Sequence, residues 1–400
     1  MQRKILIIVE NLPVPFDTRV WQEATTLAEN GYEVSVISPK GKGYEKEYEY
    51  LQGVHIHRHD MPVEGNGALG YAREYFCALR EELRLARKIY KERGFHVIHG
   101  CNPPDDIYLV ARWFRRKGVD YVFDHHDICP ELYEAKFGKS SGLLYKSQLW
   151  LERQTYKHCV FAFVTNESYK KIAIERGGMK EEDVFVLRSG PKLERLRISP
   201  PKPAIKRGKK YMVGYLGVIG QQEGIEYLLE AAHYIRNELN RNDIFWGIVG
   251  GGPHLEALRR QCHSMGLDDI VEFTGRVPDE TLLNYINTAD VCVNPDKYNA
   301  MNDKSTMNKI LEYMALGKPI VQFDLTEGRY SAQDASLYAV PNNARDLADK
   351  IIQLLEDERM RQRMSAYGRD RIINHLSWEH TSKALLEGYD KYFTERRILE

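Results

Sequence analysis

The sequence predicts an α/β protein built from two doubly wound domains, each a mostly parallel sheet with helices on both faces. Short apolar runs rich in β-branched residues alternate with amphipathic helical segments from end to end, which is typical of βαβ units. The length of 400 residues exceeds what one ordinary core holds. A proline-rich, basic segment interrupts the alternation and predicts a linker, 191–210, between domains spanning 1–190 and 211–376.

The strands and helices follow from the period of the apolar residues. The first half gives strands at 4–10, 33–39, 54–59, 96–100, 121–126 and 159–166, with its clearest helices at 19–31 and 73–94. The second half gives strands at 211–220, 245–252, 271–276, 291–295 and 319–324, separated by helices at 223–239, 254–266, 279–289 and within 302–318. A last amphipathic helix is predicted at 377–393. Because open α/β sheets bind ligands at the carboxyl ends of their strands, we expect a ligand cleft between the two sheets.

Composition excludes several classes of protein. Lys plus Arg and Asp plus Glu both number 57, and this zero net charge argues against a nucleic-acid-binding protein. The six cysteines are scattered without metal-ligand spacing, as in a reduced cytosolic protein. The apolar run 5–9 is too short for a signal peptide, and no segment reaches the length of a membrane span. We therefore expect a cytoplasmic protein.

The segment NDKSTMNKILEYMALGKPIVQFD, 302–324, predicts an anion-binding helix start. If Ser305 or Thr306 caps the helix, the first backbone N–H groups are free and carry the partial positive charge of the helix dipole. Such an end is suited to a diphosphate. The predicted phosphate-binding residues are Lys304, Ser305, Thr306, Met307 and Asn308.

Glu312 lies one to two turns behind this helix start, on the same face as Asn308 and Lys309. A carboxylate at that place can accept hydrogen bonds from both ribose hydroxyls of a nucleotide. The alternative is a solvated Glu312 that pairs with Lys309. The strand–loop–helix context of the second sheet favours the nucleotide interpretation.

Several segments resemble the family-4-like, retaining GT-B glycosyltransferases, also called group 1 glycosyltransferases. KILEYMALGKPIV resembles their nucleotide-binding helix, in which the pattern E-x7-E precedes Ala-x-Gly-x-Pro-Val-Val. Further segments fit the same family in order: LAENGYEVSVISP (27–39), FDHHDICPE (123–131), GYLGVIGQQEGIEYLLEAA (214–232) and VEFTGRVPDETLLNYINTADVCVNP (271–295). The resemblance covers nearly the whole chain.

The resemblance implies a GT-B fold, with a C-terminal helix, 377–400, that returns to the first domain. It implies transfer of a sugar from a UDP- or GDP-linked donor to a saccharide or lipid-linked acceptor, with retention of configuration, in surface polysaccharide or glycoconjugate synthesis. The second domain would bind the donor, with the backbone of Val277 at the base, Glu312 at the ribose and Lys304 at the phosphates. The family uses no metal in this task and no tightly bound cofactor, and the chain has no Asp-x-Asp at a strand end.

The chain also departs from the family pattern. Lys304 stands where the first acid of E-x7-E would be, and Asp303 beside it is the candidate replacement for holding the sugar hydroxyls. Val218 and Glu223 replace the Arg and Lys that grip the diphosphate, so Lys304 and the helix amides would supply that charge. Three glycines could bring backbone N–H groups close to phosphate, although plain tight turns explain such glycines equally well. These glycines are Gly217, Gly220 and Gly250.

In the first domain, Asp17 and Arg19 lie at a strand-to-helix junction. Asp17 either caps the helix or faces the substrate, and Arg19 could reach a phosphate or the acceptor. His126, rather than His125, matches the family histidine that lies near the transferred sugar, and His99 ends the preceding strand on the acceptor side. A core histidine is the alternative for His126. Metal binding by the adjacent pair is disfavoured because neighbours on a strand point to opposite faces.

Two further interpretations stay open. The predicted helix 73–94 carries Arg80, Arg84 and Arg87 at helical spacing, which is either a solvated face or a peripheral contact with anionic lipid. For function, a nucleotide-sugar epimerase or a phosphorylase on the same fold is the nearest alternative enzyme. Because the first acid is missing, a partner subunit that binds nucleotide sugar with little or no turnover is the alternative outside the enzymes.

Overall fold

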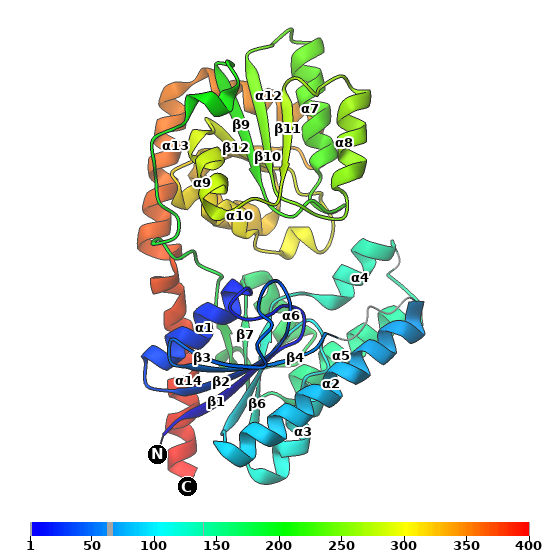
Figure 1. Cartoon of the computed structure of the whole chain (residues 1–400), viewed down its shortest axis with the longest axis vertical. Coiled ribbons are helices and arrows are strands. Elements are labelled where there is room, and N and C mark those ends of the chain that lie inside the picture. Colours follow the sequence, from blue (N-terminus) through cyan, green and yellow to red (C-terminus); the bar gives the residue numbers. More distant parts are fainter. Residues whose placement is uncertain (1, 62–66, 139, 400) are drawn as a thin grey trace. The chain divides into compact units, whose positions relative to one another are not determined.

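The computed structural model describes residues 2–61, 67–138 and 140–399, and it divides into two compact units. The first comprises Met1–Ser189 with Ser382–Glu400, and the second Gly190–Thr381 (Figure 1). Each unit contains one twisted sheet of mostly parallel strands with helices around it. The prediction of two doubly wound, Rossmann-like α/β domains is therefore confirmed.

The first unit has an eight-stranded sheet in the order β3-β4-β2-β1-β5-β6-β7-β8. All neighbouring strands pair in parallel except β3 and β4, which form an antiparallel pair. The strand order reverses between β1 and β5, so the loops after these two strands diverge and leave room for side chains at the carboxyl edge. The strands are β1 (Lys4–Val9), β2 (Glu33–Pro39), β3 (Tyr48–Leu51), β4 (Val54–His59), β5 (Val97–Cys101), β6 (Asp120–His125), β7 (Phe161–Val164) and β8 (Val184–Val186).

Helices cover both faces of this sheet. Figure 1 shows α2, α3 and α5 on one side of the sheet and α14 on the other. Tyr389 of α14 is buried and its ring packs against the rings of Phe161 and Phe163, so the C-terminal helix is part of the first unit's core. The helices are α1 (Thr18–Glu29), α2 (Gly67–Glu92), α3 (Tyr108–Phe114), α4 (Cys129–Phe137), α5 (Leu143–His158), α6 (Glu167–Glu175) and α14 (Trp378–Leu399). None of the helices in the described ranges combines the length and hydropathy that crossing a bilayer requires.

The second unit has a six-stranded parallel sheet in the order β11-β10-β9-β12-β13-β14, and this order of the strands along the chain reverses between the parallel neighbours β9 and β12. The strands are β9 (Tyr211–Leu216), β10 (Ile244–Val249), β11 (Val271–Gly275), β12 (Val291–Asn294), β13 (Ile320–Phe323) and β14 (Ser336–Ala339). The helices are α7 (Ile225–Asn237), α8 (Leu255–Ser264), α9 (Asp279–Thr288), α10 (Asn308–Ala315), α11 (Thr326–Ala332), α12 (Ala344–Glu356) and α13 (Glu358–Arg371). Apolar strand residues such as Val213 and Trp246 are fully buried, as expected for a sheet covered on both faces.

The segment 191–210, predicted as a linker, is packed on the second unit. Leu196 is buried in a core cluster that also holds Leu311 of α10. The backbone N–H of Ser199 donates to the side chain of Asn287 at 3.2 Å. Proline breaks the secondary structure here, but the segment still contributes side chains to the second unit, and one of them, Arg195, enters the candidate site.

Candidate functional site

The helix predicted to bind an anion at its start has its N-cap one or two residues later than predicted, at Met307 rather than at Ser305 or Thr306. Helix α10 begins at Asn308, with Met307 in the extended N-cap position and no side-chain cap. Neither Ser305 nor Thr306 caps it, which corrects the prediction: a short 3-10 turn at Asn302–Lys304 comes first, and the Ser305 hydroxyl donates to the carbonyl of Met301 at 2.8 Å. At the start of α10 the N–H groups of Asn308 and Lys309 are those without an intrahelical acceptor, because the N–H of Ile310 donates to the carbonyl of Met307 at 3.0 Å.

Glu312 is held by Arg195 rather than by Lys309. Its side chain is 21% exposed, and its Oε1 accepts from Arg195 Nη1 at 3.2 Å. Burial raises the pKa of Glu312, and the Arg195 guanidinium offsets part of this effect. The predicted alternative, a Glu312–Lys309 pair, is wrong, because Lys309 Nζ bonds both carboxylate oxygens of the buried Asp296, at 2.8 and 3.0 Å.

Arg195 joins Glu312 to the turn that carries Val277. Its Nε donates to Asp279 Oδ2 at 2.8 Å, at the first residue of α9. Val277 lies two residues before Asp279 and is partly buried against the core cluster that contains Leu311. Arg195 thus links Glu312 of α10 to Asp279, which lies two residues after Val277 in the sequence.

The glycine turns meet next to the start of α10. The Gly250 N–H donates to the carbonyl of Gly275 at 3.1 Å, and a Cβ on Gly250 would lie 1.8 Å from the carbonyl oxygen of Gly217. A Cβ on Gly217 would lie 3.2 Å from Lys309 Cε. The loops after β9, β10 and β11 and the first turn of α10 therefore converge at the carboxyl edge of the sheet, beside the reversal of strand order between β9 and β12.

All three predicted glycine amides have acceptors in the protein, that of Gly250 being the carbonyl of Gly275. The Gly217 N–H donates to the carbonyl of Val249 at 3.1 Å, and the Gly220 N–H donates to Glu223 Oε2 at 3.1 Å. Burial raises the pKa of Glu223. The tight-turn interpretation therefore describes Gly217 and Gly220 in this structure, and the positive φ of Gly217, 156°, gives the reason for glycine there.

A substitution at Gly250 tests how closely the turns that contain Gly250 and Gly217 pack against each other. We expect Gly250→Ala to destabilise the protein by about 2–4 kcal/mol, because its φ is 143° and the added Cβ would overlap the carbonyl of Gly217. Gly251→Ala is the matched control, since its nearest contacts would be at 3.5 Å and its φ is not positive. Urea unfolding measures both changes. Equal stability of the two variants would contradict the tight convergence.

The residues before α10 have structural partners as well. Both carboxylate oxygens of Asp303 accept from Thr326, one from its N–H at 2.8 Å and one from its hydroxyl at 3.1 Å. Asp303 thereby fixes the start of α11, so in this structure it is engaged within the protein. Lys304 ends the 3-10 turn, and its N–H donates to the carbonyl of Met301 at 3.2 Å.

In the first unit, Arg19 is a buried structural cation. Its Nη2 bonds Asp124 at 2.7 Å, its Nη1 donates to the carbonyl of Leu187 at 2.8 Å, and its Nε lies 3.0 Å from Glu23. These contacts differ from the predicted reach toward a phosphate or an acceptor, because the side chain turns into the core between α1 and β6. Asp17 caps α1 by accepting from the N–H of Val20 at 3.1 Å, the helix-cap alternative of the prediction.

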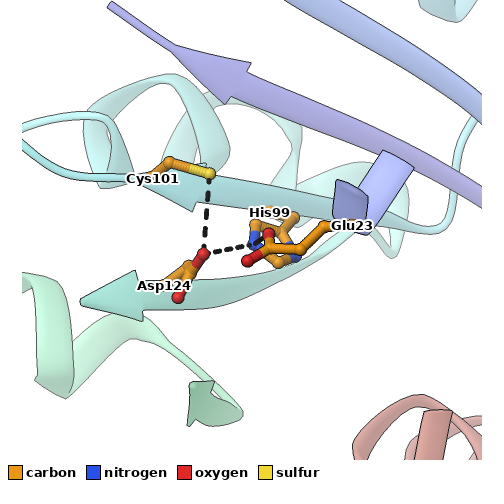
Figure 2. Close-up of side chains that lie close together, drawn as sticks. All are labelled: Glu23, His99, Cys101 and Asp124. Atoms are coloured by element: carbon orange, nitrogen blue, oxygen red, sulfur yellow. Dashed lines mark hydrogen bonds and ion pairs between the residues drawn. The ribbon is translucent and has the colours of Figure 1, made fainter. Parts of the chain in front are cut away.

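Figure 2 shows a group of four buried side chains that includes the Asp124 carboxylate: Glu23, His99, Cys101 and Asp124. His99 Nε2 lies 3.4 Å from Asp124 and 3.5 Å from Glu23, and its Nδ1 shares a 2.7 Å hydrogen bond with the Tyr389 hydroxyl. The side chain of His99 is fully buried, so it belongs to the core rather than lining an acceptor surface.

Such a group has the spacing and ligand types of a metal site, but Arg19 already supplies a cation to it. Burial raises the pKa of Glu23 well above its usual value, and the neighbouring Asp124 adds to this effect. Burial alone would raise the pKa of Asp124 too, but Arg19 and His126 hold it well below its usual value. The group is thus an ion-pair network in which Arg19 and His126 favour the charged form of Asp124, whereas burial beside Asp124 disfavours the charged form of Glu23.

His126 lies at the outer end of this network. Its ring is 14% exposed, and its Nε2 forms a short contact with Asp124 Oδ2. His125 points the other way and is buried, with its Nδ1 2.6 Å from the Tyr156 hydroxyl. Asn102 fixes the loop: its side-chain oxygen accepts from the N–H of His126 at 2.6 Å, and its amide donates to the carbonyl of Asp127. Asp124 therefore sets the direction of His126, which is partly exposed at this sheet edge.

Sequence reasoning missed Arg195, Asp279 and Asn102. Arg195 falls in a segment without periodicity, and its partners are 84 and 117 residues away, so no local pattern indicates the contact. Asn102 had a detectable signal, because an asparagine directly after a strand and before two prolines commonly hydrogen-bonds neighbouring backbone.

Two family models match the chain in succession. The model described as glycosyl transferases group 1 matches residues 200–371, and the glycosyl transferase 4-like domain matches residues 17–190. The chain therefore belongs to the group 1 glycosyltransferases of the GT-B fold class, and the family resemblance found in the sequence is confirmed.

Curated relatives are similar over part of their length. An alpha-D-kanosaminyltransferase of Streptomyces kanamyceticus is 30% identical over 158 residues, which are 38% of this chain and 39% of the relative. A GDP-mannose-dependent alpha-(1-6)-phosphatidylinositol monomannoside mannosyltransferase of Mycobacterium tuberculosis (strain ATCC 25618 / H37Rv) is 28% identical over 208 residues, 50% of this chain and 53% of the relative. The matched region thus spans about half or less of these relatives.

Solved structures match along the whole chain. Sucrose-phosphate synthase from Thermosynechococcus elongatus gives a TM-score of 0.80 at 18% identity, covering 98% of this chain and 100% of that chain. Anabaena HepE in complex with UDP and glucose gives a TM-score of 0.75 at 14% identity, with the same coverage. At such identities the likeness shows the fold alone.

Proposed function

We propose that this glycosyltransferase is a retaining enzyme that moves a sugar from a UDP- or GDP-linked donor to a saccharide or lipid-linked acceptor. The observation that carries the proposal is that Arg195 bonds both Glu312 of α10 and Asp279, two residues after Val277, while the glycine turns of the second sheet meet the first turn of α10 at Lys309. In the proposal a nucleotide takes its base contact at the Val277 turn, its ribose contact at Glu312 and its diphosphate contact at the start of α10.

In this proposal the donor lies along α10. The backbone of Val277 meets the base, and Glu312 accepts from the ribose hydroxyls with the oxygen that Arg195 leaves available. The diphosphate meets the amides at the start of α10 and the charge of Lys304. Asp303 is the candidate for holding sugar hydroxyls, and it would have to exchange its contacts with Thr326 to do so.

His126 is the proposed group at the transferred sugar. Asp124 and Asn102 fix the position of this histidine, and positioning of that kind supports a reaction that depends on orientation and on stabilisation of the departing diphosphate. The proposal includes no metal, because the chain offers amide and lysine groups for the diphosphate. A peripheral membrane contact through α2 is proposed for a lipid-linked acceptor. Arg84 of α2 bonds Glu81, and Arg87 stacks on Trp113 at 4.2 Å, so Arg80 is the arginine best placed for lipid.

The test is a donor screen. We expect UDP or GDP, and one of its sugars, to raise the Tm of the protein, and we expect that sugar nucleotide to release free nucleotide slowly in water and faster with an acceptor. Chelation with EDTA should leave both signals unchanged. Binding without any turnover would replace the proposal by a nucleotide-sugar-binding partner subunit, and the absence of binding to every nucleotide would overturn both.

A further inference from the structure

Helix α5 presents an exposed face of unusual composition. Residues spaced by three or four positions line up on one side of a helix, and along α5 these are Leu143, Lys146, Trp150, Arg153 and Lys157. All five are exposed, with Leu143 at 88% and Trp150 at 56%. We call this set the α5 face. The opposite side of α5 is buried and contributes to the core.

Further exposed apolar side chains and basic residues lie around the α5 face. Phe137 and Leu144, just before and at the start of α5, are 56% and 51% exposed. From residue 136 to residue 160 the sequence has one acid, Glu152, which is fully buried and paired with Arg176.

Helix α3 contacts both α2 and α5 on this side of the sheet. Over 108–117 the charged residues are all basic: Arg112, Arg115, Arg116 and Lys117. These residues give α5 and the adjoining α3 a local excess of positive charge, and the exposed acids Glu175 and Glu181 flank the neighbouring segment 177–179.

A surface pocket of about 650 Å³ opens on the C-terminal half of the α5 face. Its lining includes Trp150, Arg153, Tyr156 and Lys157, together with 177–179. Gly177 allows the segment 177–179 to pack directly against α5, because a Cβ at this position would lie 2.5 Å from the carbonyl of Ala173 and 2.6 Å from the Tyr156 ring. Two cations beside an indole and a phenol ring can receive a phosphate whose substituent is apolar.

We propose that the α5 face docks on an anionic lipid bilayer, with a lipid phosphate in this pocket. Leu143, Leu144 and Phe137 would enter the headgroup boundary, Trp150 would lie at its level, and Arg153 and Lys157 would meet the phosphates. A second copy of the chain fits this face less well, because a two-fold contact would place the same cations opposite one another. The inference deepens the membrane contact of the proposed function by adding an apolar anchor and a phosphate pocket on α5 to the basic contact proposed for α2. The inference rests on the proposed function in one respect: docking would give the enzyme access to a lipid-linked acceptor.

The experiment is sedimentation of the full chain with vesicles of phosphatidylcholine, with and without phosphatidylglycerol. We expect binding only to the anionic vesicles, weakened by salt. Arg153→Glu with Lys157→Glu should lower the affinity by roughly tenfold or more, and Leu143→Ser with Leu144→Ser should lower it as well. Arg359→Glu with Arg363→Glu is the matched control, since these two exposed arginines lie four residues apart on α13 of the other unit. The control should bind like the wild type.

Several outcomes would overturn the docking proposal: binding of the wild type that the α5 variants leave unchanged, an equal loss in the control, or a dimer in solution that the α5 variants dissociate. Donor turnover with a short water-soluble acceptor separates this proposal from the function itself. The α5 variants should keep the wild-type Tm and this turnover. A wild type without turnover that still binds anionic vesicles through α5 would refute the proposed function and leave the docking intact.

Discussion

Replacing Glu312 by alanine should lower donor turnover by about 100-fold or more and remove most of the affinity for the free nucleotide. A carboxylate that accepts from two ribose hydroxyls contributes about 1.5–3 kcal/mol per hydrogen bond, because one partner is charged. The fold should survive, since Arg195 keeps its pair with Asp279 and the Arg195 side chain is 43% exposed. Calorimetric titration with UDP and GDP, together with turnover at saturating acceptor, measures the effect.

Asp279→Ala is the matched control for this prediction. Asp279 is the other carboxylate of Arg195, with a 2.8 Å contact, but it has no proposed bond to the ribose. If the loss in Glu312→Ala came from freeing Arg195, Asp279→Ala should reproduce it. We expect instead that Asp279→Ala stays within about threefold of the wild type, in line with the small value of exposed ion pairs. Full turnover in Glu312→Ala would refute the ribose assignment.

The sequence was sufficient to predict the two-domain architecture and the face of α10 on which Glu312 lies, because both follow from local periodicity. The start of α10 was not predictable in this way. Ser and Thr are favoured N-caps, but the hydroxyl of Ser305 bonds the carbonyl of Met301 in the preceding turn. Competing local hydrogen bonds of this kind decide helix ends, and the residue type alone does not reveal which one forms.

Arg19 shows a second limit of sequence reasoning. A charged residue at a strand-to-helix junction suggests a ligand contact, and the same position is compatible with a buried ion pair. Its partner Asp124 is 105 residues away and carries no signal of its own beyond ending a strand. The distinction depends on whether the side chain turns toward the sheet or away from it, which only the folded structure reveals.

Asp124→Asn should destabilise the protein by about 3–5 kcal/mol, whereas Glu23→Gln should cost less than about 1 kcal/mol. Both carboxyls are fully buried and lie within 3.0 Å of Arg19. Asp124 is the ionised one, so its removal leaves a buried guanidinium without its main counter-charge. Burial raises the pKa of Glu23 and so favours its neutral form, and we therefore expect a neutral amide of the same shape to replace it with little change. Urea unfolding at neutral pH compares the two variants.

The pH dependence gives an independent check on this assignment of protons. The pKa of Asp124 is lower in the folded than in the unfolded state, so its stabilisation is present above about pH 4 and is lost as the pH falls. Asp124→Asn should therefore flatten the acid side of the stability profile. Because the pKa of Glu23 is raised in the folded state, its contribution makes stability fall as the pH rises above its unfolded pKa, so Glu23→Gln should remove that fall and leave the loss at low pH that comes from Asp124. In the double variant Glu23 can no longer ionise in place of Asp124, so the loss should exceed the sum of the single losses. Equal costs for the two single variants would show that Arg19 shares its charge evenly between them.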